Sequence, residues 1–383
     1  MLDRSLNFSD YEFDWIDAYV KSDVKLSIQP FFSYTLVDDP SNDFQTRIVY
    51  IYPPKASIDK TLFKNKKSIK SKSKNKIFRQ KLKNLLASLE SDLDDQDLSR
   101  DIDELVEFEK HLIYISNLKS FLNDTNGAQR MTFRQLNYTF PEINWIRIFS
   151  EIFDSFGIKL NKDEPVLIEN NYYFVQLEYI LNKHEKYTSR TLANYIGVKI
   201  LLEFGENMIL RISSVAESLD EISINWHCYQ FAEDMFQTGL NFLYGKHYFH
   251  SNILIQFETF VKQLRDSITS NIQRSELMDK ITKLRLQSKI DETLDQIDSS
   301  LLITDEREID NFYGDLGFIP SSDFFKAFKK ARKFHKRHFL RALRSKQNLR
   351  DFDREPNFLL KSQRTFMLEN NDLSKNFSSI NRF

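Results

Sequence analysis

The sequence predicts a mainly α-helical protein: a large multi-helix domain with a small N-terminal β-hairpin unit. Gly and Pro number only 8 each in 383 residues, far below their usual shares of roughly 7% and 5%. So few helix breakers favour long helices over a turn-rich β architecture. Apolar residues also recur at helical spacing from residue 131 onward. The 34 Phe residues supply aromatic side chains for a large helical core.

The β unit is expected between residues 24 and 52. Side chains alternate between apolar and polar in 24–28 and in 32–36, and residues 48–52 are β-branched and aromatic. This period of two predicts three strands. The Asp-rich segment 38–43 predicts the turn between the last two, and Pro53 and Pro54 end the unit.

Two oppositely charged segments follow. Residues 60–83 form a basic low-complexity run, which predicts a mobile loop because its like charges repel and its apolar content is low. Residues 89–109 predict an amphipathic helix with an acidic face. We expect one domain over residues 1–345, and the polar segment 346–383 predicts a poorly ordered tail.

A series of helices is expected after residue 140. The first begins at Phe140-Pro141-Glu142, with Pro in its first turn and Trp145 on its buried face. Residues 166–168 predict a short extended link. Thr188 and Ser189 are the expected cap of the third helix. The remaining predicted helices cover 171–181, 191–204, 226–249, 251–269 and 273–298, and a basic helix runs from a cap at 321–323 to about residue 344.

The stretch from Ser275 to Lys289 is expected to be one helical surface. Leu277, Ile281 and Leu284 lie at i, i+4 and i+7, so they are predicted to face a core. Asp279 and Lys283 lie four apart with the acid first, which predicts an ion pair along the helix.

Charge and cysteine content narrow the function classes. The net charge is −1, so the molecule as a whole has no electrostatic bias toward nucleic acid or anionic membrane. Cys228 is the single cysteine, which rules out an internal disulfide. The N-terminus has no apolar signal region, and no run of about 20 apolar residues predicts a membrane span. These features leave the localisation undetermined.

No group of residues in the sequence predicts catalysis or metal binding. His-Glu-x-x-His, which places two imidazoles around zinc with a Glu base, does not occur. His247 and His250 lie three apart without a nearby carboxylate, and His335 and His338 lie among Lys and Arg residues that oppose cation binding. Cys228 follows His227, but adjacent helix residues diverge, which favours a core cysteine. Gly-rich phosphate loops and Gly-x-Ser-x-Gly are absent. We therefore predict no catalytic, cofactor-binding or metal-ligating residue and no cofactor within this chain.

The basic helix at 324–346 has two interpretations. Nine cations surround five apolar residues (Lys326, Lys329, Lys330, Arg332, Lys333, Lys336, Arg337, Arg341 and Arg344 around Phe325, Phe328, Phe334, Phe339 and Leu340). Such helices can bind anionic membranes or nucleic acid. The interpretation we favour is a surface helix whose Phe side packs inward, and no nucleic-acid partner is expected.

Several segments, taken in order, resemble the neprilysin-like zinc metallopeptidases. The matching segments are 32–36 with its Asp-rich turn, Glu107 to Leu112, Met131 to Trp145, Thr191 to Ile196, Trp226 to Phe249, and Met278-Asp279-x-x-Thr282-Lys283 followed by Lys289. The family has Trp where Leu277 stands and Arg where Lys283 stands. Together the segments span about residues 24–345 of the chain.

This resemblance implies the helical N-terminal cap domain, which in the family covers the catalytic domain and limits access to peptides. The family's zinc motif lies in its C-terminal half, so no catalytic or metal residue carries over to this chain. The implied partners are peptides or a metallopeptidase catalytic domain, and the implied location is extracellular or at the plasma membrane. We expect a non-catalytic cap domain; the alternatives are a helical peptide- or protein-binding module, and a nucleic-acid or anionic-membrane binder acting through its basic segments.

Overall fold

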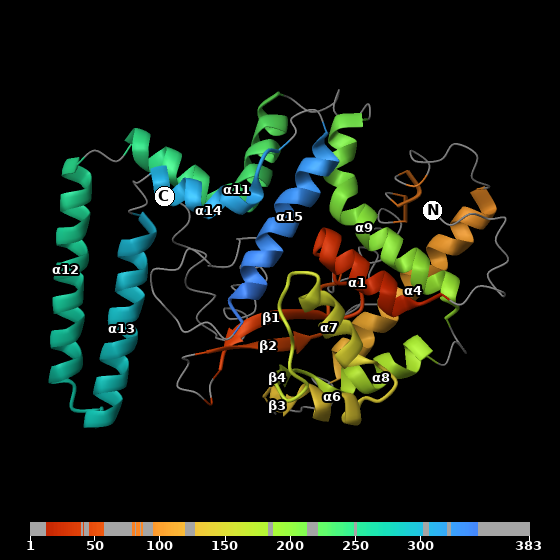
Figure 1. Cartoon of the computed structure of the whole chain (residues 1–383), viewed down its shortest axis with the longest axis horizontal. Coiled ribbons are helices and arrows are strands. Elements are labelled where there is room, and N and C mark those ends of the chain that lie inside the picture. The colour runs from red at the N-terminus through yellow and green to blue at the C-terminus, as the bar shows by residue number, and fades with distance from the viewer. Residues whose placement is uncertain are drawn as a thin grey trace, which may run out of the picture. The chain divides into compact units, whose positions relative to one another are not determined.

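The computed structural model describes residues 13–39, 41, 46–56, 79–80, 82–84, 86, 95–118, 127–182, 187–212, 221–248, 251–301, 306–319 and 323–343. The chain divides into two compact units, the first formed by Met1–Ile224 with Leu340–Arg344 and the second by Asn225–Phe339 with Ser345–Phe383. Helices dominate, with one small sheet in the first unit (Figure 1), so the predicted fold class is confirmed. The predicted tail 346–383 lies outside the described residues, as does most of the predicted loop 60–83. The described residues 79–80 and 82–83 are helical, so that end of the loop prediction was wrong.

The first element, helix α1 (Trp15–Leu26), replaces the strand predicted at 24–28. Asp14 caps it by accepting hydrogen bonds from the backbone N–H groups of Ile16 and Asp17. Trp15, Ile16, Tyr19, Val20 and Leu26 are buried at helical spacing. The helix ends at Ser27, which adopts a left-handed conformation with φ 55°. The short alternation at 24–28 was therefore the last turn of a helix and its cap.

The sheet has four strands in the order β1-β2-β4-β3. β1 (Ser33–Asp38) and β2 (Arg47–Tyr52) pair antiparallel, which confirms the predicted hairpin. β4 (Pro165–Ile168) pairs parallel to β2 and antiparallel to β3 (Gln129–Thr132). The segment predicted as an extended link at 166–168 is thus a central strand, and its Val166 and Ile168 are buried.

Helices surround this sheet in the first unit (Figure 1). In chain order they are α4 (Asp95–Ser116), α6 (Phe133–Thr139), α7 (Trp145–Asp154), α8 (Asn171–Asn182) and α9 (Ser189–Ile212). α8 and α9 agree with prediction, and Thr188 accepts from the Thr191 N–H at the start of α9. The helix predicted from Phe140 begins instead at Trp145, because Asn144 accepts from the Arg147 N–H and so caps the helix there. α4 matches the predicted acidic helix over 95–109 and continues beyond it.

Two adjacent residues between α1 and β1 organise the core of the first unit. Phe31 contacts rings from α1, α4 and α9, including Tyr195 at 5.9 Å between ring centroids. Phe32 stacks on Tyr19 at 4.4 Å and contacts Trp145 of α7 at 5.0 Å. Edge and offset aromatic contacts of this kind stabilise beyond the area that they bury. The large Phe content is thus used in a helical core, as the composition indicated.

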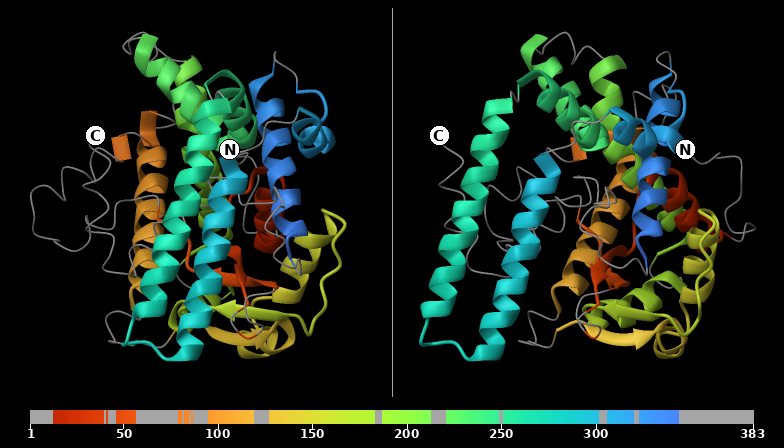
Figure 2. Two further views of the ribbon diagram at one scale, coloured as in Figure 1. Left: turned by 90° about the vertical axis from the view of Figure 1, so that its left-hand side faces the viewer. Right: turned by 60° about the vertical axis from the view of Figure 1, so that its left-hand side comes forward.

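The second unit contains α11 from Asn225 onward, α12 (Ser251–Arg274), α13 (Lys280–Leu301), α14 (Glu306–Tyr313), a short 3-10 turn η3 (Gly314–Leu316) and most of α15 (Phe324–Arg341). α11 (Glu221–Tyr248) bends at Phe236, where φ is −136°. α12 and α13 form a long antiparallel hairpin, visible in both views of Figure 2. α15 matches the predicted basic helix and is capped by Asp323, which accepts from the Lys326 N–H.

The stretch predicted as one helical surface at 275–289 contains the turn of this hairpin. Leu277 is 98% exposed, Ile281 65% and Leu284 64%, so the prediction that they face a core of this chain was wrong. Asp279 caps α13 by accepting from the Ile281 and Thr282 N–H groups. Lys283 Nζ donates to the carbonyl oxygen of Gln273 at 3.0 Å, in place of the ion pair expected with Asp279.

Candidate functional site

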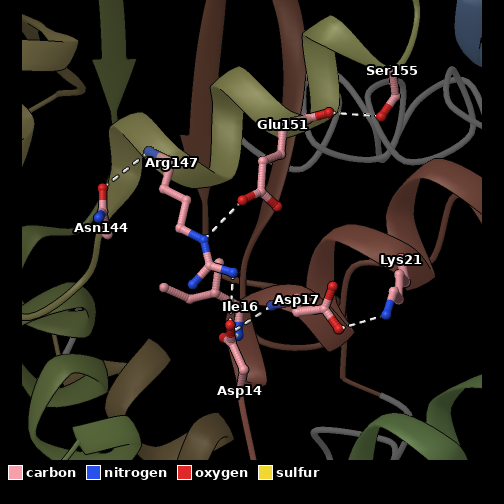
Figure 3. A network of polar contacts seen from close by, with 8 residues as sticks. All are labelled: Asp14, Ile16, Asp17, Lys21, Asn144, Arg147, Glu151 and Ser155. Carbon is pink, nitrogen blue, oxygen red and sulfur yellow. Dashed lines mark hydrogen bonds and ion pairs between the residues drawn. The ribbon is translucent and has the colours of Figure 1, made fainter.

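A surface network joins the start of α1 to the start of α7 (Figure 3). Arg147 donates from Nη2 to Asp14 Oδ2 at 2.7 Å and from Nε to Glu151 Oε1 at 2.8 Å. Partial burial of Asp14 opposes its ionisation, but hydrogen bonds from Arg147 and two backbone N–H groups outweigh it and lower the pKa of Asp14. The hydrogen bond to Asp14 is also the main reason that the pKa of Arg147 is raised. Each charged side chain in the network has a protein partner, which indicates a structural role.

A buried carboxyl group lies deeper in the first unit. Asp23 is 0% exposed; it accepts from the Tyr34 hydroxyl at 2.7 Å and from Gln29 Nε2 at 3.1 Å. Burial, followed by the nearby Asp23, raises the pKa of Tyr34 well above its usual range. The Tyr34 hydroxyl therefore stays protonated and acts as a permanent donor. This arrangement joins α1 to β1.

A second buried carboxyl group, Glu109 of α4, faces α9. It accepts from the Tyr195 hydroxyl and lies 3.8 Å from Lys199 Nζ. Burial and the proximity of Glu109 raise the pKa of Tyr195. The cavity that these three residues help to line has a volume of about 10 Å³, enough for about one water molecule. A substrate does not fit there, so this cluster too holds helices together.

The histidine pair of α15 does not form a metal site. His335 is buried and its Nε2 pairs with the carbonyl oxygen of Met235, which requires Nε2 to carry the hydrogen. Burial, with smaller effects from His338 and Arg332, lowers the pKa of His335 to about 4, although the Met235 hydrogen bond acts in the opposite direction. His335 is therefore a neutral donor at neutral pH, and that nitrogen is not free to bind a metal.

Of the other sequence candidates, only one has a described side chain. His247 is exposed on α11. The side chains of Cys228, His227 and His250 lie outside those the structure describes. Across the described residues, no group of three or more His, Cys, Asp or Glu side chains could hold a metal ion. These described residues do not fit a zinc centre.

α15 divides its cations between the surface and the interior. Phe328, Phe334 and Phe339 are buried, so the predicted inward packing of its Phe side is confirmed for these three. Arg332 and Lys336 are also buried, which the sequence interpretation did not foresee. On its exposed side, Lys326 pairs with Asp323, Lys330 donates to the Phe318 carbonyl, and Arg337 lies near Asp315. Within the described part of the chain, no helix has the length and apolar character needed to cross a bilayer.

Comparison with known proteins identifies the family to which this fold belongs. The model of the N-terminal region of peptidase family M13 matches residues 2–298. The chain belongs to peptidase family M13. It carries the neprilysin-like N-terminal domain of that zinc-dependent family, as the ordered segments in the sequence indicated.

Curated M13 relatives are similar to this chain at low sequence identity. Neprilysin-1 of Trittame loki is 20% identical over 260 residues, which cover 64% of this chain and 35% of the relative. Membrane metallo-endopeptidase-like 1 of Mus musculus is 22% identical over 251 residues, covering 58% and 32%. The chain thus spans about a third of the length of these M13 relatives.

Solved structures support the fold. PEPO of Lactobacillus rhamnosis has a TM-score of 0.60 at 14% identity, with 89% of this chain and 52% of PEPO covered. The zinc metalloprotease ZMP1 of Mycobacterium tuberculosis in its open state has a TM-score of 0.58 at 11% identity, covering 90% and 52%. About half of each solved relative lies outside the shared M13 fold.

Proposed function

We propose that this chain is the cap domain of a zinc metalloendopeptidase, that it covers a catalytic half and that it restricts access to peptide substrates. The observation that carries the proposal is the match of residues 2–298 to the N-terminal region of family M13. The similarity to PEPO over 89% of this chain supports the same domain fold. The catalytic partner is the part of an M13 peptidase that this fold does not include.

In this proposal the chain as printed does not hydrolyse peptides by itself. The sequence contains no His-Glu-x-x-His, the spacing that places two zinc ligands and a general base on one helix. The polar clusters at Asp23 and Glu109 join helices and strands to one another, and the cavity beside Glu109 is too small for a peptide. The contribution of this domain is therefore steric: it shapes the entrance to chemistry performed elsewhere.

Peptidase activity of the purified chain tests this. A library of internally quenched fluorogenic peptides is incubated with the chain plus zinc, with and without a chelator, and the full-length zinc metalloprotease ZMP1 serves as the positive control. The expected result is no chelator-sensitive hydrolysis by the chain. Chelator-sensitive cleavage that co-elutes with the homogeneous chain would show that it contains a catalytic centre, and would refute the proposal.

The proposed location is extracellular or at the plasma membrane. The name of the mouse relative, membrane metallo-endopeptidase-like 1, supports this for an M13 domain. Surface biotinylation of intact cells that produce the protein tests it. Labelling of the chain together with known surface proteins is the expected result, and labelling only after lysis would contradict it.

A second candidate function is a helical module that binds peptides or proteins. The outer face of α8 favours it, because Tyr172, Val175 and Tyr179 lie at i, i+3 and i+7 and are 43%, 52% and 45% exposed. Tyrosine is enriched where proteins bind one another. Changing Tyr172 and Val175 to Ser in a tagged chain and comparing the recovered partners tests this. A specific partner lost from the variant supports the module, and identical recovery from both forms counts against it.

A further inference from the structure

An uncovered row of apolar side chains begins in the loop between α12 and α13 and continues through the first two helical turns of α13. Leu277, Ile281 and Leu284, here called the apolar stripe, are 98%, 65% and 64% exposed. Ile281 and Leu284 lie three residues apart in α13 and so share one side of that helix. Leu277 precedes the helix, in the turn of the hairpin. Single exposed leucines are common, but a row of neighbouring ones marks a surface that another molecule covers.

The contacts that hold the hairpin together leave this stripe uncovered. Gln287 of α13 donates to Thr269 of α12 at 2.7 Å, and Arg265 of α12 lies 3.8 Å from Asp291 of α13. On α12, Val261 and Ile272 are buried. The hairpin is therefore formed through other positions, and the stripe is not needed for it.

The rim of the stripe has a positive bias. Arg274, Lys280 and Arg285 are exposed around it. Two carboxylates lie in the same stretch, the exposed Glu276 and Asp279, which caps α13 and accepts from the Thr282 hydroxyl at 2.8 Å. The cations outnumber them. A complementary surface would be apolar at its centre with acidic groups at its edge.

We propose that the apolar stripe docks the C-terminal half of an M13 peptidase, an inference that rests on the proposed cap function. The family match ends at residue 298, inside α13, so the stripe belongs to the last hairpin of the matched region. This chain covers only 51–52% of the length of the solved relatives. In each relative, a further region of similar length is therefore present, and the shared fold could pack against it. An apolar row near the end of the matched region is suited to that contact.

Site-specific photo-crosslinking in cells that make the protein tests this surface. A photoreactive phenylalanine replaces Ile281, and in a matched control it replaces the exposed Asp266 of α12. Products are identified by mass spectrometry. We expect residue 281 to join to a segment from the C-terminal half of an M13 peptidase, with a yield roughly tenfold or more above that from residue 266. Leu284→Asp should reduce the yield at 281 by roughly tenfold, as expected for loss of a central interface contact.

A charge-matched variant separates docking from folding. Gln263→Asp adds the same charge at an exposed position of α12 and should change the yield less than twofold. Both variants should unfold at the temperature of the parent chain, since both positions are exposed. Three results would refute docking at the apolar stripe while leaving the cap function intact. They are equal yields from residues 266 and 281, no product at 281, and a yield at 281 that does not change with Leu284→Asp. A product with a second copy of this chain, or with a protein outside family M13, would also overturn it. Absence of any M13 C-terminal segment from both probes would count against the cap function itself.

Discussion

The hydrogen bond between Tyr34 and Asp23 offers a sharp test of what stabilises the first unit. Tyr34→Phe removes a single oxygen atom and leaves the ring that contacts Phe149 at 5.1 Å in place. The Asp23 carboxyl group then keeps Gln29 as a donor but loses the hydroxyl at 2.7 Å. Because both residues are buried, water does not readily replace the lost donor.

The expected cost follows from that burial. Leaving a buried acceptor without its partner lowers the free energy of unfolding of the protein by about 1–3 kcal/mol. The deleted hydroxyl leaves a void of only one oxygen atom, so the cavity contribution is small beside the loss of the hydrogen bond. For a unit of about 200 residues, a loss of about 2 kcal/mol lowers the unfolding midpoint by roughly 4–8 °C.

Thermal and urea unfolding of the two proteins measure this loss, and Tyr138→Phe is the matched control. Tyr138 is 89% exposed, so its hydroxyl is hydrated and its removal should cost almost nothing. The reasoning is refuted if Tyr34→Phe is as stable as Tyr138→Phe. A cycle with Asp23→Asn adds a second criterion: the two changes should be non-additive, because they affect the same hydrogen bond.

Three further predictions concern other contacts. Thr132→Ala should destabilise the first unit by about 1 kcal/mol, because Thr132 forms a reciprocal capping box with Gln135 at the start of α6; urea titration measures this, and Thr132→Ser should retain most of the stability. Asp14→Asn should lower stability at neutral pH only. The pKa of Asp14 is lowered, so its contribution is present above the ordinary value of 3.8 and is lost as pH falls through the folded pKa; unfolding curves of the two forms should converge there. His335 has a pKa lowered from 6.5 to about 4, so the neutral side chain stabilises the fold fully above pH 6.5, and up to about 3 kcal/mol is lost on acidification toward pH 4; His335→Gln should flatten this dependence, and an equally steep curve would contradict the assignment.

The elements that the sequence predicts well are those whose signal is local. The paired strands near residues 33–38 and 47–52 have a period of two. The helices α8, α9 and α15 have apolar residues at helical spacing and a capping side chain at the start. The α1 helix also had a local signal, an Asp14 cap before buried residues at helical spacing, but a short alternation at 24–28 competed with it. Five residues are too few to separate the two periods.

The buried polar clusters were beyond sequence reasoning. Tyr195 and Glu109 are 86 positions apart, and nothing local marks either as a partner of the other. The same holds for β4, whose parallel pairing with β2 joins residues more than a hundred positions apart. Such contacts form only when tertiary packing brings distant elements together.

By itself, the sequence determined the helical class and the M13 resemblance, because the scarcity of Gly and Pro and the ordered short motifs are properties of the chain alone. Only the tertiary structure decided which apolar rows are covered. Trp145, Phe149 and Ile152 of α7 lie at i, i+4 and i+7 and are fully buried, whereas Leu277, Ile281 and Leu284 have the same spacing in the sequence but remain exposed. Periodicity identifies a face that prefers burial, and the packing of the whole chain determines whether that burial occurs within it.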